Sequence, residues 1–73
     1  ERRLARKEMA RLEKQMTRLR DRRSGLEARM AELGQAQDFD ALTAASADLK
    51  DLDAQLDVLE EEWLQAAELA EGD

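Results

Sequence analysis

The chain has 73 residues with no cysteine, no histidine and no proline, and with one Trp and one Phe as its only aromatic residues. Without a thiol or an imidazole there is little to support nucleophilic or general acid–base chemistry, so we expect no catalytic residue, no metal site and no bound cofactor in this chain. Leu, Val and Phe number only 14 of 73 residues, which together with a net charge of −6 would suggest disorder. Ala, Glu, Lys, Leu and Arg, however, make up 47 of 73 residues, the composition of a coiled coil or a long helix.

The first predicted element is an amphipathic helix over about residues 2–33. Apolar side chains recur there at alternating intervals of four and three residues, which is the spacing of a coiled-coil seam. The seam positions are Ala5, Met9, Leu12, Met16, Leu19, Arg23, Leu26, Met30 and Leu33. Only Arg23 interrupts the apolar pattern; it either sets the register of the pairing, or its long stem passes the seam and carries the charge to solvent.

The pattern stops at a short polar tip, residues 34–38, and a second helix is predicted over about residues 39–70. Gly34 comes directly after the last seam residue, where glycine often ends a helix, and Asp38 is placed to cap the next one. The second seam is apolar throughout: Leu42, Ala45, Leu49, Leu52, Leu56, Leu59, Trp63, Ala66 and Ala70. Because so short a tip cannot carry the chain back along a helix of about 45 Å, the helices must run antiparallel. The predicted fold is all-α, a single two-helix antiparallel coiled-coil hairpin.

The most regular pairing of the two seams places Leu33 opposite Leu42 at the tip and Leu12 opposite Trp63 farther along. Two ion pairs across the interface are expected in this register, Arg20 with Asp53 and Arg29 with Asp48. If exposed, such pairs contribute well under about 1 kcal/mol each to stability.

The two predicted helices carry opposite charge. Residues 1–33 hold 11 Lys/Arg against 6 Asp/Glu, a net +5, whereas residues 34–73 hold one Lys against 12 Asp/Glu, a net −11. Part of this contrast is explained by pairing inside the hairpin. Five basic residues, however, fall on seam-distant positions of the first helix: Arg3, Lys7, Arg11, Lys14 and Arg18. This cationic stripe is about 22 Å long, which suits the phosphate backbone of a nucleic acid; the alternative is that it only keeps the coiled coil in solution.

Three segments in this order carry a resemblance to a known family. They are the basic helix at residues 6–13, the sequence Asp-Phe-Asp-Ala-Leu at residues 38–42, and the ending Leu-Glu-Glu-Glu-Trp-Leu at residues 59–64. Together they resemble the C-terminal coiled-coil domain of the ABC-F ATPases, particularly the Uup-like branch, over nearly the whole chain. The chain begins at Glu1 without an initiator Met, and we expect it to be a fragment of such a protein.

The resemblance implies a cytoplasmic parent with two ATP-binding cassettes, with ATP and Mg as cofactors and without a transmembrane domain, acting on the ribosome. The parent would be an ATPase, but its ATPase residues would lie outside this chain. The hairpin would be an arm that binds nucleic acid, either rRNA or tRNA in translation or DNA. By position, the residues of the cationic stripe would form the nucleic-acid-binding face.

Two alternatives remain open. The C-terminal coiled-coil arm of valyl-tRNA synthetases has the same basic-then-acidic order and contacts tRNA, but it does not typically share the ending at Trp63 and Leu64. A purely structural protein-interaction coiled coil is the other alternative. A nucleic-acid-binding hairpin is expected to be a monomer. We expect no contact with a membrane, because the sequence has no run of about 18 apolar residues that could span one.

Overall fold

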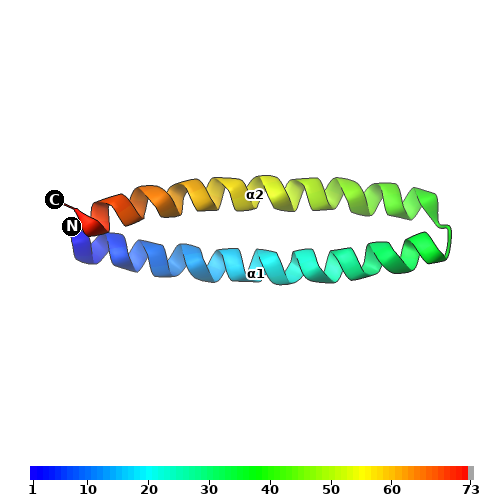
Figure 1. The fold of residues 1–73 in the computed structure, drawn as a ribbon, viewed down its shortest axis with the longest axis horizontal. Helices are drawn as coiled ribbons and strands as arrows, with labels where there is room; N and C mark the ends of the chain where they lie inside the picture. Colours follow the sequence, from blue (N-terminus) through cyan, green and yellow to red (C-terminus); the bar gives the residue numbers. More distant parts are fainter. Residues whose placement is uncertain (73) are drawn as a thin grey trace.

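A computed structural model describes residues 1–72 and contains two long helices joined by a short tip (Figure 1). Helix α1 runs over Arg2–Gln35 and helix α2 over Phe39–Glu71. The helices lie side by side in opposite directions, and at the open end the Arg2 guanidinium donates a 3.2 Å hydrogen bond to the carbonyl oxygen of Gly72. The Cα atoms extend over 55 × 15 × 11 Å. The predicted all-α, two-helix antiparallel hairpin is confirmed.

The contact between the helices is formed by the predicted seams. Every seam residue is buried or half-buried. The buried ones are Ala5, Leu12, Met16, Leu33, Ala45, Leu52, Leu56 and Ala66. The tightest part is a cluster of Leu12, Met16 and Leu56, in which Leu12 is 0% exposed. Trp63 packs against this cluster, which agrees with the register that places it opposite Leu12.

The end of α1 differs from the prediction. Helix α1 does not stop before Gly34 but continues through it to Gln35, and the left-handed residue is Gln37, with φ of 59°. The Gln37 amide donates to the Gly34 carbonyl (3.1 Å) and the Asp38 amide to the Leu33 carbonyl (3.0 Å). These two bonds are those of a Schellman motif, in which the left-handed residue follows the helix by two positions. Gly34 lowers helix propensity but does not end the helix, so that prediction was wrong.

The start of α2 is as predicted. Asp38 is the N-cap, and its carboxylate accepts a 3.2 Å hydrogen bond from the amide of Ala41. Asp40 lies in the first turn, where a negative charge interacts favourably with the helix dipole. Because Asp38 takes part in both the closure of α1 and the cap of α2, only residues 36–38 are needed to connect the two helices.

Replacing Gln37 by glycine is expected to stabilise the hairpin by about 0.5–1 kcal/mol, since glycine adopts the left-handed conformation without the cost that a Cβ imposes. Urea denaturation followed by circular dichroism at 222 nm measures the change. Gly34→Ala is the matched variant: a Cβ at Gly34 meets no atom within 4 Å, and alanine is favoured in a helix by about 1 kcal/mol. Destabilisation by both variants would show that Gly34, and not Gln37, terminates α1.

Candidate nucleic-acid interface

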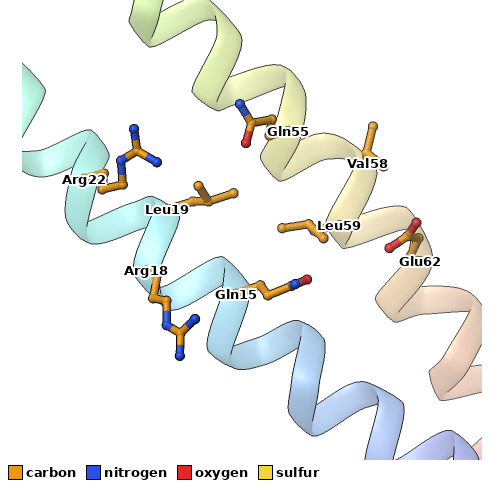
Figure 2. Close-up of a pocket in the computed structure, with 8 residues that line it drawn as sticks. All are labelled: Gln15, Arg18, Leu19, Arg22, Gln55, Val58, Leu59 and Glu62. Atoms are coloured by element: carbon orange, nitrogen blue, oxygen red, sulfur yellow. The ribbon is translucent and has the colours of Figure 1, made fainter.

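The five residues of the cationic stripe, Arg3, Lys7, Arg11, Lys14 and Arg18, all lie on α1 with exposed side chains. Their spacing confines them to an arc of about 80° around the helix, centred on the side away from the seam. In Figure 2 the side chain of Arg18 points away from α2. The stripe is therefore presented to solvent along the outer side of the hairpin.

Hydrogen bonding within the described residues involves only one member of the stripe. The Arg11 guanidinium donates two hydrogen bonds to the Glu8 carboxylate, from Nε at 2.9 Å and from Nη2 at 2.5 Å. These bonds raise the pKa of Arg11 and lower the pKa of Glu8. The side chains of this pair are about half exposed, 53% for Arg11 and 45% for Glu8, and ion pairs at the surface are weak, so Arg11 remains available to another anion. Across residues 1–72 the side chains of the other four members form no hydrogen bond or ion pair.

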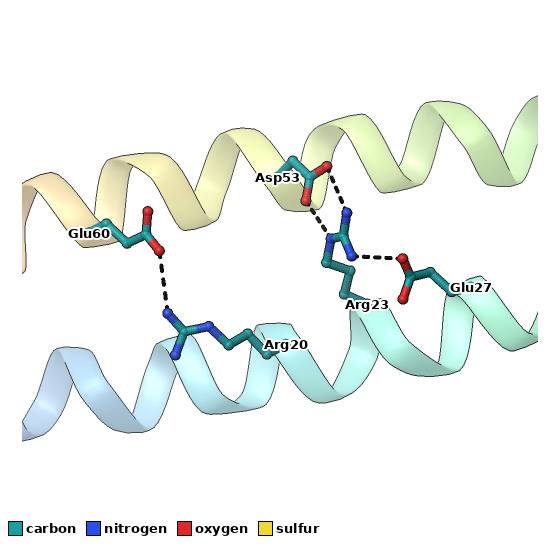
Figure 3. Close-up of polar contacts among 5 residues, drawn as sticks. All are labelled: Arg20, Arg23, Glu27, Asp53 and Glu60. Carbon is teal, nitrogen blue, oxygen red and sulfur yellow. Dashed lines mark hydrogen bonds and ion pairs between the residues drawn. The ribbon is translucent and has the colours of Figure 1, made fainter.

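Arg23, the one charged seam residue, is held at the edge of the interface by two carboxylates (Figure 3). Its Nε donates to Asp53 at 2.6 Å and its Nη1 donates to Glu27 at 2.8 Å. The hydrogen bond with Asp53 raises the pKa of Arg23 and lowers the pKa of Asp53. The Arg23 side chain is 35% exposed, so its stem packs at the seam while its charge stays at the surface.

Two acids, Glu13 and Glu60, lie close together at the same edge of the interface, and each accepts a hydrogen bond from another side chain. The Trp63 indole donates a 3.0 Å hydrogen bond to Glu13, and the Arg20 guanidinium donates one of 3.3 Å to Glu60. The predicted pair of Arg20 with Asp53 was wrong, because Arg23 reaches Asp53 from the seam and Arg20 turns towards the open end (Figure 3). Both arginines are bonded to acids of α2, on the other edge of the hairpin from the cationic stripe.

The opposite edge of the interface is a shallow groove (Figure 2). Leu19 and Leu59 point toward one another in it, and the amide groups of Gln15 and Gln55 extend over it from either helix. Towards the tip the groove continues between basic residues of α1 and acidic residues of α2, namely Arg22, Arg29, Asp48 and Asp51. The predicted pair of Arg29 with Asp48 was wrong, since the ion-pair partner of Arg29 is Glu32 of its own helix, at 4.0 Å.

Arg22 shares the properties of the cationic stripe, although the sequence interpretation did not include it. Its side chain is exposed and forms no hydrogen bond or ion pair within residues 1–72. The signal was present in the sequence, because Arg22 follows Arg18 by four residues and so lies on the same side of α1. The heptad assignment obscured it, since Arg22 falls on a position that flanks the seam.

Asp53→Asn is expected to reduce the acid sensitivity of the fold. The pKa of Asp53 is lowered below 3.8 in the folded chain, so the interaction with Arg23 stabilises the fold above the unfolded pKa and is lost as the pH falls through the folded value. Thermal melts between pH 7 and pH 2.5 should therefore show a smaller loss of stability on acidification in this variant. Asp57→Asn, an exposed change on the same helix, controls for relief of repulsion among the acids of α2. Equal pH profiles for the two variants would contradict the prediction.

Two further properties concern the described residues as a whole. Neither helix of residues 1–72 contains a stretch apolar enough to cross a membrane. In the same residues, no three carboxylates come together as metal ligands would.

A family model described as the ABC transporter C-terminal domain matches residues 2–68. The match covers the tip, nearly all of both helices and the entire cationic stripe. The chain belongs to this family. This agrees with the resemblance to the C-terminal coiled coil of ABC-F ATPases, and it favours a parent ABC ATPase over the valyl-tRNA synthetase alternative. Neither a curated protein sequence nor a solved structure matches this ABC transporter C-terminal domain.

Proposed function

We propose that this ABC transporter C-terminal domain is the nucleic-acid-binding arm of a cytoplasmic ABC-F type ATPase and contacts RNA or DNA through the cationic stripe. The supporting observation is that only some of the basic residues of α1 are bonded to α2. Arg20 and Arg23 are bonded to acids of α2, whereas Arg3, Lys7, Lys14 and Arg18 are exposed and unbonded within residues 1–72. Positive charge that does not hold the hairpin together is available to phosphates.

The proposed contact is directed at the nucleic-acid backbone. Lysine and arginine side chains on a regular helix face neutralise phosphates and release their counterions, which supplies affinity without reading the base sequence. The acidic helix α2 repels phosphate and so confines the nucleic acid to the outer side of α1. ATP and Mg would bind the parent's cassettes, and the ribosome would be the parent's partner through its rRNA or a bound tRNA.

Salt dependence tests this proposal. With a fluorescently labelled duplex of about 20 base pairs, the hairpin should bind with micromolar affinity at about 50 mM salt. Five neutralised phosphates predict that the logarithm of the association constant falls with the logarithm of salt concentration with a slope of about −4.5. Absent or salt-independent binding at about 50 mM salt would reject a nucleic-acid arm.

The groove in Figure 2 supports a second candidate function, that of a protein-interaction module. Its apolar residues Leu19 and Leu59 are only half-buried, and an additional helix would cover them. Sedimentation equilibrium separates the two functions, because the nucleic-acid arm is expected to be a monomer. A dimer at micromolar concentration that is indifferent to RNA and DNA would favour the interaction module.

A further inference from the structure

We infer that the nucleic-acid contact continues past the cationic stripe to Arg22 and Arg29, passing over Gly25, and that its ligand is a double-stranded backbone. The inference rests on the proposed function and adds two binding residues and the class of ligand to it. It follows from the geometry of α1, from the bonding of its arginines and from the positions of the two aromatic residues.

The extended line, defined as the cationic stripe together with Arg22 and Arg29, repeats every 11 residues. Its members fall into three series: Arg3 and Lys14; Lys7, Arg18 and Arg29; and Arg11 and Arg22. Eleven residues make three turns with an excess of only about 20°, so each series runs almost straight along the helix. From Arg3 to Arg29 the extended line is about 39 Å long. Gly25 comes 11 residues after Lys14 and so continues the first series, but it has no side chain.

The two added arginines are available to a ligand. Arg22 is exposed and forms no side-chain bond in residues 1–72, and the ion pair of Arg29 with Glu32 is long, at 4.0 Å, with 64% of the Arg29 side chain exposed. Arg20 and Arg23, which lie on either side of Arg22 in the sequence, point to the other edge of the hairpin and are bonded to α2 (Figure 3). In the folded hairpin, therefore, Arg20 and Arg23 are bonded to α2, whereas Arg22 and Arg29 are exposed and make no bond to α2 within residues 1–72.

Acids of α2 lie near Arg22 and Arg29 and reduce the affinity that these two arginines can contribute. Asp48 and Asp51 line the groove together with Arg22 and Arg29, because a line with an 11-residue repeat gradually approaches a seam with a seven-residue repeat. Neither acid forms an ion pair with these arginines in the described part of the chain. We expect Arg22 and Arg29 to contribute less affinity per residue than Lys14, which borders a hollow formed by residues of α1 alone.

The positions of the two aromatic residues favour duplex over single-stranded nucleic acid. Proteins that bind single strands combine a basic groove with aromatic side chains on which unpaired bases stack. The extended line contains no aromatic residue. Phe39 lies at the tip, at the start of α2, and Trp63 packs against the core cluster with its indole nitrogen bonded to Glu13. This face of the helix carries the seven cations of the extended line, with the acids Asp21 and Glu32 beside them and no aromatic side chain. It suits the backbone of a duplex, which offers phosphates and no exposed base faces.

A matched pair of gain-of-charge variants tests the extended line. Gly25→Arg places a guanidinium on the line, and a Cβ at Gly25 meets no atom within 4 Å. Ser24→Arg adds the same charge one residue earlier, about 100° around the helix and off the line. At about 100 mM salt, Gly25→Arg should tighten duplex binding about three- to eight-fold and steepen the salt slope by about one, while Ser24→Arg should change affinity less than about two-fold.

A loss-of-charge variant and a strand comparison complete the experiment. Arg22→Gln/Arg29→Gln should weaken binding and reduce the salt slope by up to about two, and a 20-base-pair duplex of DNA or RNA should bind more tightly than either of its single strands. Equal effects of Gly25→Arg and Ser24→Arg, or no effect of the double glutamine variant, would overturn the extended line. Equal or tighter binding of single strands would overturn the ligand class. Absence of any binding by the unchanged hairpin would instead reject the proposed function itself.

Discussion

Leu12→Ala is expected to lower the free energy of unfolding by about 2–5 kcal/mol, the largest stability effect of any single truncation in this hairpin. Leu12 is 0% exposed and belongs to the tightest core cluster, with Met16 and Leu56. A two-helix rod has only one line of core contacts, so the neighbouring side chains cannot close the cavity from a second layer. Because small domains have a total stability of about 0.05–0.15 kcal/mol per residue, this loss takes a large share of it.

Thermal and urea unfolding followed by circular dichroism at 222 nm measure the effect of Leu12→Ala. Leu64→Ala is the matched control, since it removes the same atoms from a side chain that is 53% exposed, and it should cost less than about 0.5 kcal/mol. Similar midpoints for the two variants would show that the Leu12 cluster does not dominate the stability of the hairpin.

The combined variant Arg11→Glu, Lys14→Glu and Arg18→Glu is expected to abolish detectable nucleic-acid binding. It replaces three central cations of the stripe by anions, so that each lost phosphate contact is also replaced by a repulsion. With about 0.9 counterions released per phosphate contact, removal of three contacts alone lowers affinity by a factor of several hundred at about 100 mM salt. Glutamate has a helix propensity close to that of lysine and arginine, so the hairpin should remain folded.

Matched double variants distinguish position from net charge. Lys14→Glu/Arg18→Glu and Arg2→Glu/Arg6→Glu each make the chain more negative by four units, but only the first pair lies on the stripe. Fluorescence anisotropy with a labelled duplex should show a strong loss for the stripe pair and a much smaller loss for the other. Equal losses would mean that overall charge, and not the stripe, governs binding, and the proposed site would be wrong.

The overall acidity of the chain describes neither helix by itself. The net charge of −6 is the sum of a basic first helix and a strongly acidic second one. In the folded hairpin these charges lie on different sides of a rod whose Cα atoms span 15 Å and 11 Å in its two short directions, which is comparable to the screening length in physiological salt. A phosphate backbone on the outer side of α1 is therefore mainly exposed to the nearby cations.

Much of the fold could be predicted from the sequence, because a coiled coil is specified by periodicity. The four-three spacing of Leu, Met and Ala identified both seams, and every seam residue is buried or half-buried. The short tip required an antiparallel arrangement, and the position of Asp38 identified the N-cap of α2. These features depend on neighbours along one helix or on chain length, and both can be read directly from the sequence.

Tertiary structure decided the features that depend on how far side chains reach. Gln37, not Gly34, adopts the left-handed conformation, because closure of the tip is set by where both helices end. Asp53 is bonded by Arg23 and not by Arg20, since long flexible side chains choose partners by reach across the interface. The sequence by itself determined the helices, their direction and the side of α1 on which the cations gather. Only the packed hairpin determined which arginines are bonded to α2 and which remain exposed and unbonded within residues 1–72.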